Sequence, residues 1–360
     1  STLHDAAAKH DLIFPLTLGA RGSAMIGGLL STNAGGSNVV RYGSTRGLCL
    51  GLEVVMADGR IMNLMSALHK DNSGLDLRNL VIGAEGTLGI ITAAVLKLRP
   101  KPQAYATAMV AVPSLADALT LLHRLQDETG GGVEAFEYMP RSYIDKHRQL
   151  FKDSQLPFDT EYDVNIMIEV AATMARDAVQ NPDGSLPVVT ALEETLGQML
   201  DEGTVLDAVI AQNETQRRAI WKRREDAGEV AFFGGVFVNT DVALPLDKIA
   251  AFEAMLTPRI KAIDPDANEV IVAHLGDGNI HHTSYISRND PAAMDALVEA
   301  VEDVVQELGG SFSAEHGIGV SKLETMKRRK DPVALDAMRA IKAALDPNNI
   351  LNPGKVIPAR

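Results

Sequence analysis

The pattern of apolar and polar residues changes character near residue 101. Before that point, short apolar runs are separated by glycine-rich stretches, and the pattern predicts strands at 51–57 and 88–96. Asp58-Gly59 lies between the apolar runs Val54-Val55-Met56 and Arg60-Ile61-Met62, and this dipeptide favours a tight turn. We therefore expect a hairpin there, in a region with little helical periodicity.

Strand-like and helix-like patterns alternate after Pro100 and Pro102. The predicted strands are 105–112, 133–138, 164–171, 205–210, 236–244, 270–274 and 311–314. The predicted helices are 114–128, 187–200, 214–231, 246–263, 291–308 and 333–345, the first of them capped by Ser114. Short links between these elements indicate an α+β domain, in which helices cover one face of an antiparallel sheet.

Composition describes a globular chain of two domains. A length of 360 residues exceeds one ordinary core, and 46% hydrophobic with 22% charged residues is a typical balance. The sequence has no run of 18 apolar residues, no export signal at its start and a single cysteine, Cys49. These features favour a reducing, cytoplasmic location.

Net charge excludes one class of partner. With 34 basic and 47 acidic residues, the net charge is −13 and repels phosphate backbones, so we expect no nucleic-acid partner. An anionic substrate would need positive charge supplied locally by its site.

Three glycine clusters stand out in the first hundred residues: Gly27-Gly28 through Gly35-Gly36, then Arg41-Tyr42-Gly43, then Gly83 through Gly89. Glycine lets the backbone approach a ligand closely, and free amides in such loops suit phosphates and flavin edges. The same glycines would equally make turns in an all-β region. No Gly-x-Gly-x-x-Gly fingerprint follows a strand, so a Rossmann site is not indicated.

The strongest chemical pattern is His274-Leu275-Gly276-Asp277-Gly278-Asn279-Ile280-His281, followed by Glu315-His316-Gly317. The segment 276–279 is turn-forming, so His274 and His281 can face each other across a hairpin. Two imidazoles and a carboxylate suit a divalent metal with open positions. On spacing alone, two hydrogen-bonded core histidines are an equal alternative.

Longer motifs in the first domain are similar to those of a known family. They are Gly22-Ser23-Ala24-Met25-Ile26-Gly27-Gly28, Thr32-Asn33-Ala34-Gly35-Gly36, Arg41-Tyr42-Gly43, Asp71 through Leu77, and Glu85-Gly86-Thr87-Leu88-Gly89-Ile90-Ile91-Thr92. Together they resemble the FAD domain of the vanillyl-alcohol-oxidase-like flavoproteins. Within that superfamily, the chain resembles the branch of D-lactate, glycolate and D-2-hydroxyglutarate dehydrogenases along almost its whole length.

The resemblance implies an α+β fold with three parts. Residues 1–100 would form the C-terminal part of the FAD-binding domain, 101–330 a substrate- and metal-binding domain, and 331–360 a helix and tail that return to the flavin. Family members begin with a further subdomain that carries a pyrophosphate-binding loop. This chain starts at Ser1 without it, so we expect a truncated protein that binds FAD weakly or not at all.

The resemblance also implies a set of flavin-binding residues. They are Gly19, Ala24, Gly27, Gly28, Thr32, Asn33, Gly35, Gly36, Gly43, Glu85, Gly86, Gly89, Ile91 and Asn352. Asn352 belongs to the closing segment Asp346 through Lys355, which would also suit a capped helix end followed by a turn.

Carried over residue by residue, the family pattern makes His274, His281 and Glu315 the metal ligands and His316 the catalytic base. Zinc, iron and manganese all suit these ligands. His282 would point to the opposite face of a regular strand and is expected to be a bystander.

Substrate residues follow from the same resemblance. Arg224, in the helical run Trp221-Lys222-Arg223-Arg224, matches the arginine that grips the substrate carboxylate, although a charged helix face is often only solvated surface. Gly228 stands where the hydroxyglutarate enzymes carry threonine, and Asn239 where they carry lysine. The missing lysine argues against a dicarboxylate substrate, while Asn239 can still donate a hydrogen bond.

The implied function is FAD- and metal-dependent oxidation of a D-2-hydroxy acid to the 2-oxo acid, with hydride transfer to flavin. Three alternatives stay open: a flavoenzyme of the alkyl-dihydroxyacetone-phosphate synthase type, a zinc hydrolase, and a metal-binding fragment that is inactive for lack of FAD. The expected partners are a small 2-hydroxy-acid anion and an electron acceptor, for which a quinone, a flavoprotein carrier or a cytochrome are all compatible. The acceptor would allow a peripheral membrane location, and a homodimer is compatible with the sequence.

Overall fold

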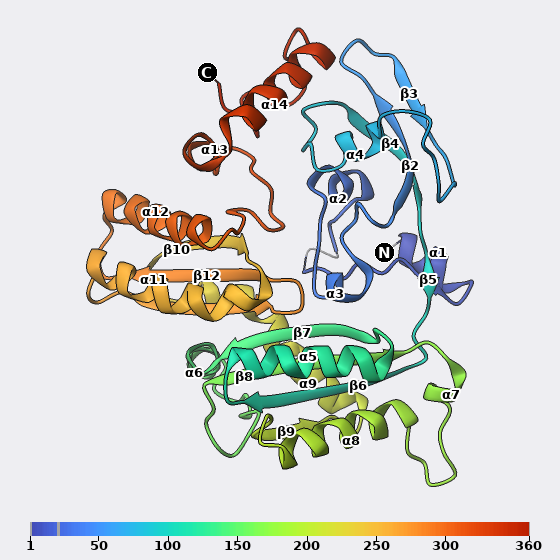
Figure 1. Ribbon diagram of the computed structural model, residues 1–360, viewed down its shortest axis with the longest axis vertical. Coiled ribbons are helices and arrows are strands. Elements are labelled where there is room, and N and C mark those ends of the chain that lie inside the picture. The colour runs from blue at the N-terminus through green and yellow to red at the C-terminus, as the bar shows by residue number, and fades with distance from the viewer. Residues whose placement is uncertain (1, 20–21, 360) are drawn as a thin grey trace. The chain divides into compact units, whose positions relative to one another are not determined.

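The computed structural model describes residues 2–19 and 22–359, which form two compact units. The first unit comprises Ser1–Asn38, Tyr42–Pro100 and Ser313–Arg360, and the second comprises Val39–Arg41 and Lys101–Phe312 (Figure 1). The sequence placed residues 313–330 with the substrate domain, whereas their contacts group them with the first unit.

The first unit contains two small antiparallel sheets. The strands are β1 (Leu12–Ile13) paired with β5 (Arg99–Pro100), and β2 (Cys49–Val55), β3 (Ile61–Leu64) and β4 (Ile90–Leu96) in the order β3-β2-β4. The helices are α1 (Thr2–Ala8), α2 (Ile26–Thr32), α4 (Leu77–Val81), α13 (Leu323–Arg329) and α14 (Pro332–Leu345), while α3 (Val39–Tyr42) is shared with the second unit. Buried Leu30, Leu52 and Val54 form part of the core between α2 and the three-stranded sheet.

The predicted hairpin at Asp58-Gly59 is confirmed. Val55 pairs with Ile61, the Met56 amide donates to the Arg60 carbonyl at 2.9 Å, and Gly59 has a φ of 84°. The helix α2 was not expected, because its sequence starts with a glycine pair that lowers helix propensity. It ends at Asn33, whose φ of 52° lies in the left-handed region that asparagine tolerates.

The second unit is built on one seven-stranded sheet in which all neighbouring strands are antiparallel. Its order is β10-β12-β11-β7-β8-β6-β9, with β6 (Ala104–Val112), β7 (Val133–Pro140), β8 (Val164–Ala172), β9 (Asp207–Ile210), β10 (Val236–Ala243), β11 (Asn268–His274) and β12 (Asn279–Ile286). The helices are α5 (Leu115–Thr129), α6 (Arg141–Leu150), α7 (Ala175–Ala178), α8 (Pro187–Asp201), α9 (Glu214–Glu225), α10 (Ala227–Ala231), η1 (Leu246–Lys248), α11 (Ile249–Ile263) and α12 (Pro291–Glu307). The α+β fold with an antiparallel sheet is therefore confirmed.

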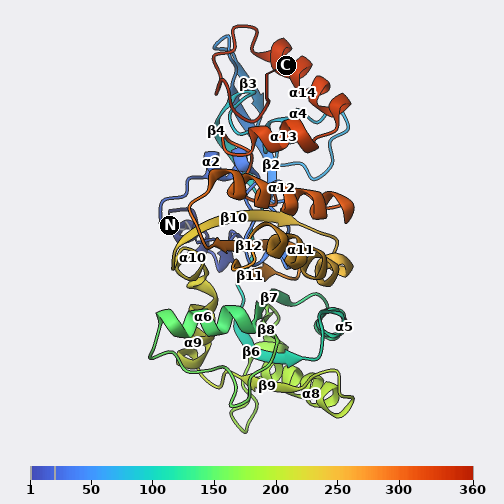
Figure 2. The same cartoon turned by 90° about the vertical axis from the view of Figure 1, so that its left-hand side faces the viewer.

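Helices cover both faces of this sheet, not one face as the sequence suggested. Figure 2 shows α6, α9 and α10 on one side of the strands and α5, α8, α11 and α12 on the other. The strand residues agree, because Ala108 and Val110 of β6 belong to one buried cluster while Met109 and Ala111 belong to the other. We call the side with α6, α9 and α10 the polar face, because buried carboxylates of the sheet pair with α9 there. The other side is the apolar face.

Most predicted elements of this unit are present within a few residues of their expected ends. The predicted helix 214–231 is two helices, because the chain leaves helical geometry at Asp226. The short strand expected at 311–314 is reduced to a single bridge between Ser311 and Ala243. In the described part of the chain, no helix has both the length and the apolar sequence that a membrane crossing requires.

Candidate active site

Strand pairing brings the two histidines of the motif together. His274 ends β11, His281 lies on β12, and a turn over 275–278 joins the two strands. Gly278 has a φ of 83°, and a β-carbon there would lie 2.2 Å from the Leu244 carbonyl oxygen, so this turn requires glycine. The His274 and His281 ring centroids lie 5.4 Å apart, nearly perpendicular to each other.

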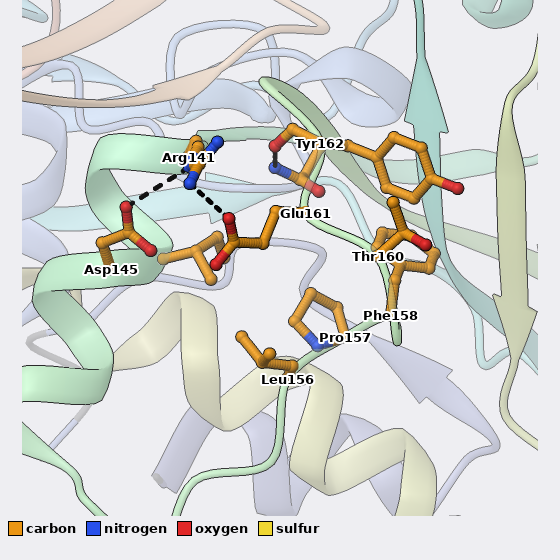
Figure 3. A pocket seen from close by; sticks show the side chains of 10 residues that line it. Arg141, Asp145, Leu156, Pro157, Phe158, Thr160, Glu161 and Tyr162 are labelled. Atoms are coloured by element: carbon orange, nitrogen blue, oxygen red, sulfur yellow. Dashed lines mark hydrogen bonds and ion pairs between the residues drawn. The ribbon is translucent and has the colours of Figure 1, made fainter.

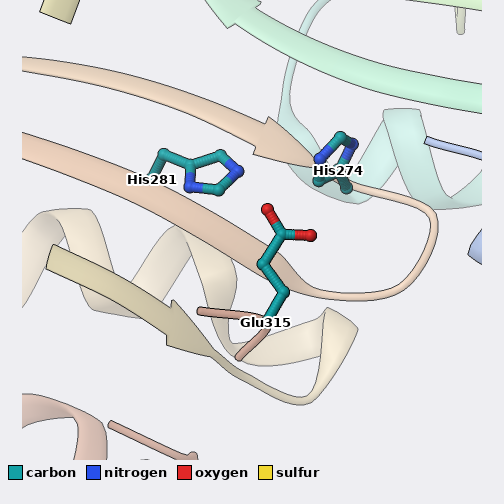
Figure 4. A group of neighbouring side chains, drawn as sticks. All are labelled: His274, His281 and Glu315. Atoms are coloured by element: carbon teal, nitrogen blue, oxygen red, sulfur yellow. The ribbon is translucent and has the colours of Figure 1, made fainter. Parts of the chain in front are cut away.

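Glu315 completes a group that fits a metal ion (Figure 4). His274, His281 and Glu315 each offer one ligand atom, and these atoms all lie within 4.8 Å of one another. Among the described residues, this is the one group of at least three potential ligands with such spacing. Two nitrogens and one carboxylate oxygen are the donor set of catalytic zinc sites and also suit iron and manganese.

Glu137 supports His274 from the neighbouring strand. It lies directly opposite His274 in the β7–β11 register, and its Oε1 atom is 2.8 Å from His274 Nδ1. Glu137 is fully buried. A carboxylate that binds Nδ1 makes Nε2 the ligand atom, which is how metal-bound histidines are usually oriented.

Arg224 of α9 forms an ion pair with Glu137. Its Nε donates to Glu137 Oε2 at 2.6 Å, and its Nη2 lies 3.3 Å from both ring nitrogens of His274. Burial by itself would raise the pKa of Glu137, but Arg224 and His274 outweigh burial and lower that pKa to about 2. Arg224, which we expected to grip a substrate carboxylate, therefore uses Nε and Nη2 for contacts within the described chain.

A second buried carboxylate fixes the helix that carries Arg224. Glu169 of β8 accepts two hydrogen bonds of 2.7 Å from Arg217 and one of 2.7 Å from the Trp221 indole. Arg217, Trp221 and Arg224 are all on α9, so the pairs at Glu169 and Glu137 hold both halves of this helix against the sheet.

Three buried carboxylates were not expected from the sequence: those of Glu137, Glu169 and Asp241. Asp241 is buried and lies directly opposite His281 in the β10–β12 register. Their common signal is an isolated carboxylate within an apolar strand, where a charged residue is rare unless it is paired.

The other predicted residues of this region lie in different surroundings. Asn239 is exposed and donates from Nδ2 to Thr283 Oγ1 at 2.8 Å. The His316 side chain is 58% exposed, and its Nε2 lies 3.5 Å from Glu315. His282 points to the apolar face, where its Nε2 lies 3.0 Å from Glu269 and its ring meets Phe252.

Several residues expected to bind flavin also make contacts that hold the first unit together. The carboxylate of Glu85 accepts hydrogen bonds from the amides of Ile318 and Gly319 at 2.8 and 2.9 Å. The Asn352 side chain donates to the Glu85 carbonyl at 2.6 Å, and the Asn33 side chain accepts from the Arg46 amide at 2.9 Å. The bonds to Ile318 and Gly319 link the loop at Glu85 to the segment that follows His316.

Backbone packing explains further members of this set. A β-carbon on Gly36 would lie 1.9 Å from the Thr17 carbonyl oxygen, and one on Gly89 would lie 2.4 Å from Val54. Thr32 donates from Oγ1 to the Gly28 carbonyl within α2. A glycine is therefore required at positions 36 and 89 by the fold alone.

The remaining residues predicted to bind flavin either have open space around them or are partly exposed. A β-carbon on Gly19, Gly28, Gly43 or Gly86 would meet nothing within 4 Å, and Gly27 approaches the Ile91 carbonyl. Ala24, Gly35 and Ile91 are partly exposed. The flavin assignment of the whole set stays a prediction.

A separate hollow near the start of α6 does not resemble a catalytic site (Figure 3). It is lined by Arg141, Asp145, Phe158 and Glu161, among others. Arg141 pairs with both Asp145 and Glu161, so its charge is already balanced within the chain.

Two family models match the chain. Residues 101–356 match the C-terminal domain of FAD-linked oxidases, and residues 1–65 match an FAD-binding domain. The first match covers well over half of the sequence. The chain belongs to the FAD-linked oxidase family.

Curated relatives give a more specific likeness. The chain is 39% identical to the mitochondrial D-2-hydroxyglutarate dehydrogenase of Bos taurus, with 97% of the chain and 62% of that protein covered. It is 35% identical to the Rattus norvegicus enzyme, with 98% and 63% covered. It is 33% identical to the D-2-hydroxyglutarate dehydrogenase of Stutzerimonas stutzeri (strain A1501), with 99% and 75% covered. The chain thus spans less than two thirds of the length of the two mammalian relatives.

Solved structures agree on the fold. An alkyldihydroxyacetonephosphate synthase superposes with a TM-score of 0.66 at 17% identity, covering 98% of this chain and 62% of that one. A p-cresol methylhydroxylase superposes with a TM-score of 0.62 at 15% identity, covering 91% and 68%. At such low identities the likeness supports the architecture and says nothing of the reaction.

Proposed function

We propose that this chain supplies the metal and substrate residues for FAD-dependent oxidation of a D-2-hydroxy acid to the 2-oxo acid. The observation that carries the proposal is the group formed by His274, His281 and Glu315 in a member of the FAD-linked oxidase family. The relatives named D-2-hydroxyglutarate dehydrogenase support the substrate class.

The donor set fits a divalent metal, and the open glycines of the first unit fit a flavin edge. Gly28 and Gly86 have free space where a β-carbon would stand, and residues 1–65 match an FAD-binding domain. When bound, a divalent metal supplies positive charge that lowers the pKa of the substrate hydroxyl, and FAD supplies the two-electron acceptor.

The protein's own residues would then have separate tasks. His316 has an exposed imidazole and would accept the hydroxyl proton, for which an imidazole near neutral pH is well suited. Arg224 would attract the substrate carboxylate through Nη1, since Nε and Nη2 already contact Glu137 and His274. Glu137 would orient His274 so that His274 can bind the metal. Asn239 would donate a hydrogen bond to the substrate.

Two rival functions fit less well. A zinc hydrolase would use the same ligands but leaves the FAD-binding match of residues 1–65 without a purpose. A transferase of the alkyl-dihydroxyacetone-phosphate synthase type shares the architecture only.

The test is substrate-dependent loss of the visible flavin absorbance. The chain is mixed with FAD and zinc under anaerobic conditions, and D- or L-2-hydroxyglutarate or D-lactate is added. We expect a D-acid to bleach the flavin and the L-acid not to. If the chain binds FAD and the bound flavin stays oxidised with both D-acids, the proposal is contradicted.

His316→Ala, with His123→Ala as the matched control, separates the base from the ligands. His123 is an exposed residue of α5. We expect His316→Ala to slow bleaching about 100-fold or more while zinc content stays unchanged. Bleaching at the wild-type rate would remove His316 from its assigned role.

A further inference from the structure

A lysine with no place in the proposed chemistry lies on the polar face of the sheet. Lys146 projects from α6, and its Nζ lies 3.0 Å from the centre of the Tyr285 ring. Tyr285 is on β12, the strand that carries His281, and the two residues are four positions apart. Because side chains alternate along a strand, residues 281, 283 and 285 share one face.

Among the described residues, no carboxylate pairs with the half-buried ammonium group of Lys146. Burial lowers the pKa of Lys146 to about 8, and no charged neighbour contributes to that shift. Among the described residues, the contact recorded for its ammonium group is with the Tyr285 ring. A partly desolvated cation without a carboxylate partner is costly, and an anionic ligand would remove that cost.

The neighbourhood of Lys146 is held rigidly. Tyr285 donates from its hydroxyl to the carbonyls of Val230 and Ala231 at 3.0 and 2.9 Å. Tyr143, which is also on α6, donates to the Arg223 carbonyl of α9. The ammonium group is therefore positioned by the same packing that holds α9, the helix of Arg224.

Distances along the strand match a dicarboxylate. Four residues of β12 span about 13 Å, from the ligand His281 to Tyr285. A metal–ligand bond, an extended five-carbon diacid and one hydrogen bond together cover such a span. Asn239 and Thr283 lie opposite each other between these two points.

We propose that Lys146 binds the distal carboxylate of a dicarboxylic 2-hydroxy acid and so determines specificity at the proposed site. This role rests on the proposed function. It reverses the expectation that Asn239, standing in place of a lysine, disfavours a dicarboxylate, because the positive charge would come from α6 instead of β10.

Affinity measured by calorimetry tests this assignment apart from turnover. The zinc-loaded chain is titrated with D-2-hydroxyglutarate and with D-2-hydroxybutyrate, which has the same reacting end without the distal carboxylate. We expect Lys146→Met to weaken D-2-hydroxyglutarate binding about 10-fold or more and to leave D-2-hydroxybutyrate unchanged. Lys146→Arg should restore most of the preference.

Lys152→Met is the matched control, because Lys152 is exposed and the substitution removes the same charge. Melting temperatures of all variants show whether Lys146→Met has damaged the fold. If Lys146→Met keeps the wild-type preference for the diacid, or if wild type prefers the monoacid, the assignment of Lys146 is wrong and the proposed function stands. If wild type binds neither acid, the proposed function fails together with it.

Discussion

The two faces of the seven-stranded sheet bury acidic side chains in different ways. On the polar face, Glu137 and Glu169 are each held by an arginine of α9 and by a second donor. On the apolar face, Glu253 of α11 has one buried carboxylate oxygen without a hydrogen-bond partner in the described chain. Arg224 and His274 lower the pKa of Glu137, whereas burial raises the pKa of Glu253 to about 7.

This difference indicates that the two faces of the sheet have different roles. The apolar face packs four long helices through residues such as Leu121 and Leu297, and it supplies stability by burying apolar surface. The polar face buries charged side chains that are neutralised in pairs, and the Glu137–Arg224 pair contacts His274. Buried ion pairs contribute little net stability, so their value here is to orient groups.

The largest expected effect comes from the apolar face. Leu121 of α5 is fully buried, and Leu121→Ala should lower the free energy of unfolding by about 2–5 kcal/mol because it leaves a cavity. Zinc affinity of the folded protein should not change. Chemical denaturation and zinc titration measure the two quantities, and a loss of zinc affinity in this variant would remove the contrast between the faces.

A smaller effect is expected at the polar face, and in a different quantity. Glu137→Gln keeps the shape of the side chain but weakens the hold on His274, so zinc affinity should fall about 10–100-fold. Competition with a chromophoric chelator measures this change, with Glu128→Gln at an exposed position of α5 as the control. Equal zinc affinity in both variants would mean that Glu137 serves α9 alone.

The smallest effect concerns Glu253 and depends on pH. Because burial raises its pKa above the ordinary value of 4.5, the folded protein favours the protonated form, and this stability is lost as pH rises through about 7. Glu253→Gln cannot ionise and should be more stable than wild type by about 1–2 kcal/mol at pH 8, with no gain near pH 4. Unfolding curves at both pH values check the sign, and a gain that is the same at pH 4 and pH 8 would contradict it.

Local signals made much of the fold predictable. Ser114 caps α5 by accepting a hydrogen bond of 3.2 Å from the Asp117 amide, and Asp58-Gly59 forms the turn of its hairpin. Both features were predictable because they depend on residues only a few positions apart. The pairing of His274 with His281 was predictable for the same reason, since a short turn joins their strands.

Features that depend on distant residues were not predictable. Glu137 pairs with Arg224, which is 87 positions away in the sequence, and no periodic pattern predicts that ion pair. The helix after Trp221 breaks at Asp226, which lies 3.0 Å from His147 of α6 in a buried pair. The helix α6 itself was missed, because only Tyr143, Ile144 and His147 among its ten residues are buried.

The central claim is that His274, His281 and Glu315 bind one divalent metal ion for oxidation of a 2-hydroxy acid. Metal analysis of the purified chain, alongside His281→Ala and His123→Ala, tests it most directly. The account predicts about one tightly bound zinc, iron or manganese ion per chain in wild type and His123→Ala, and loss of it in His281→Ala. A folded wild-type chain that takes up no divalent metal, or a His281→Ala variant that binds it as tightly as wild type, would contradict the account.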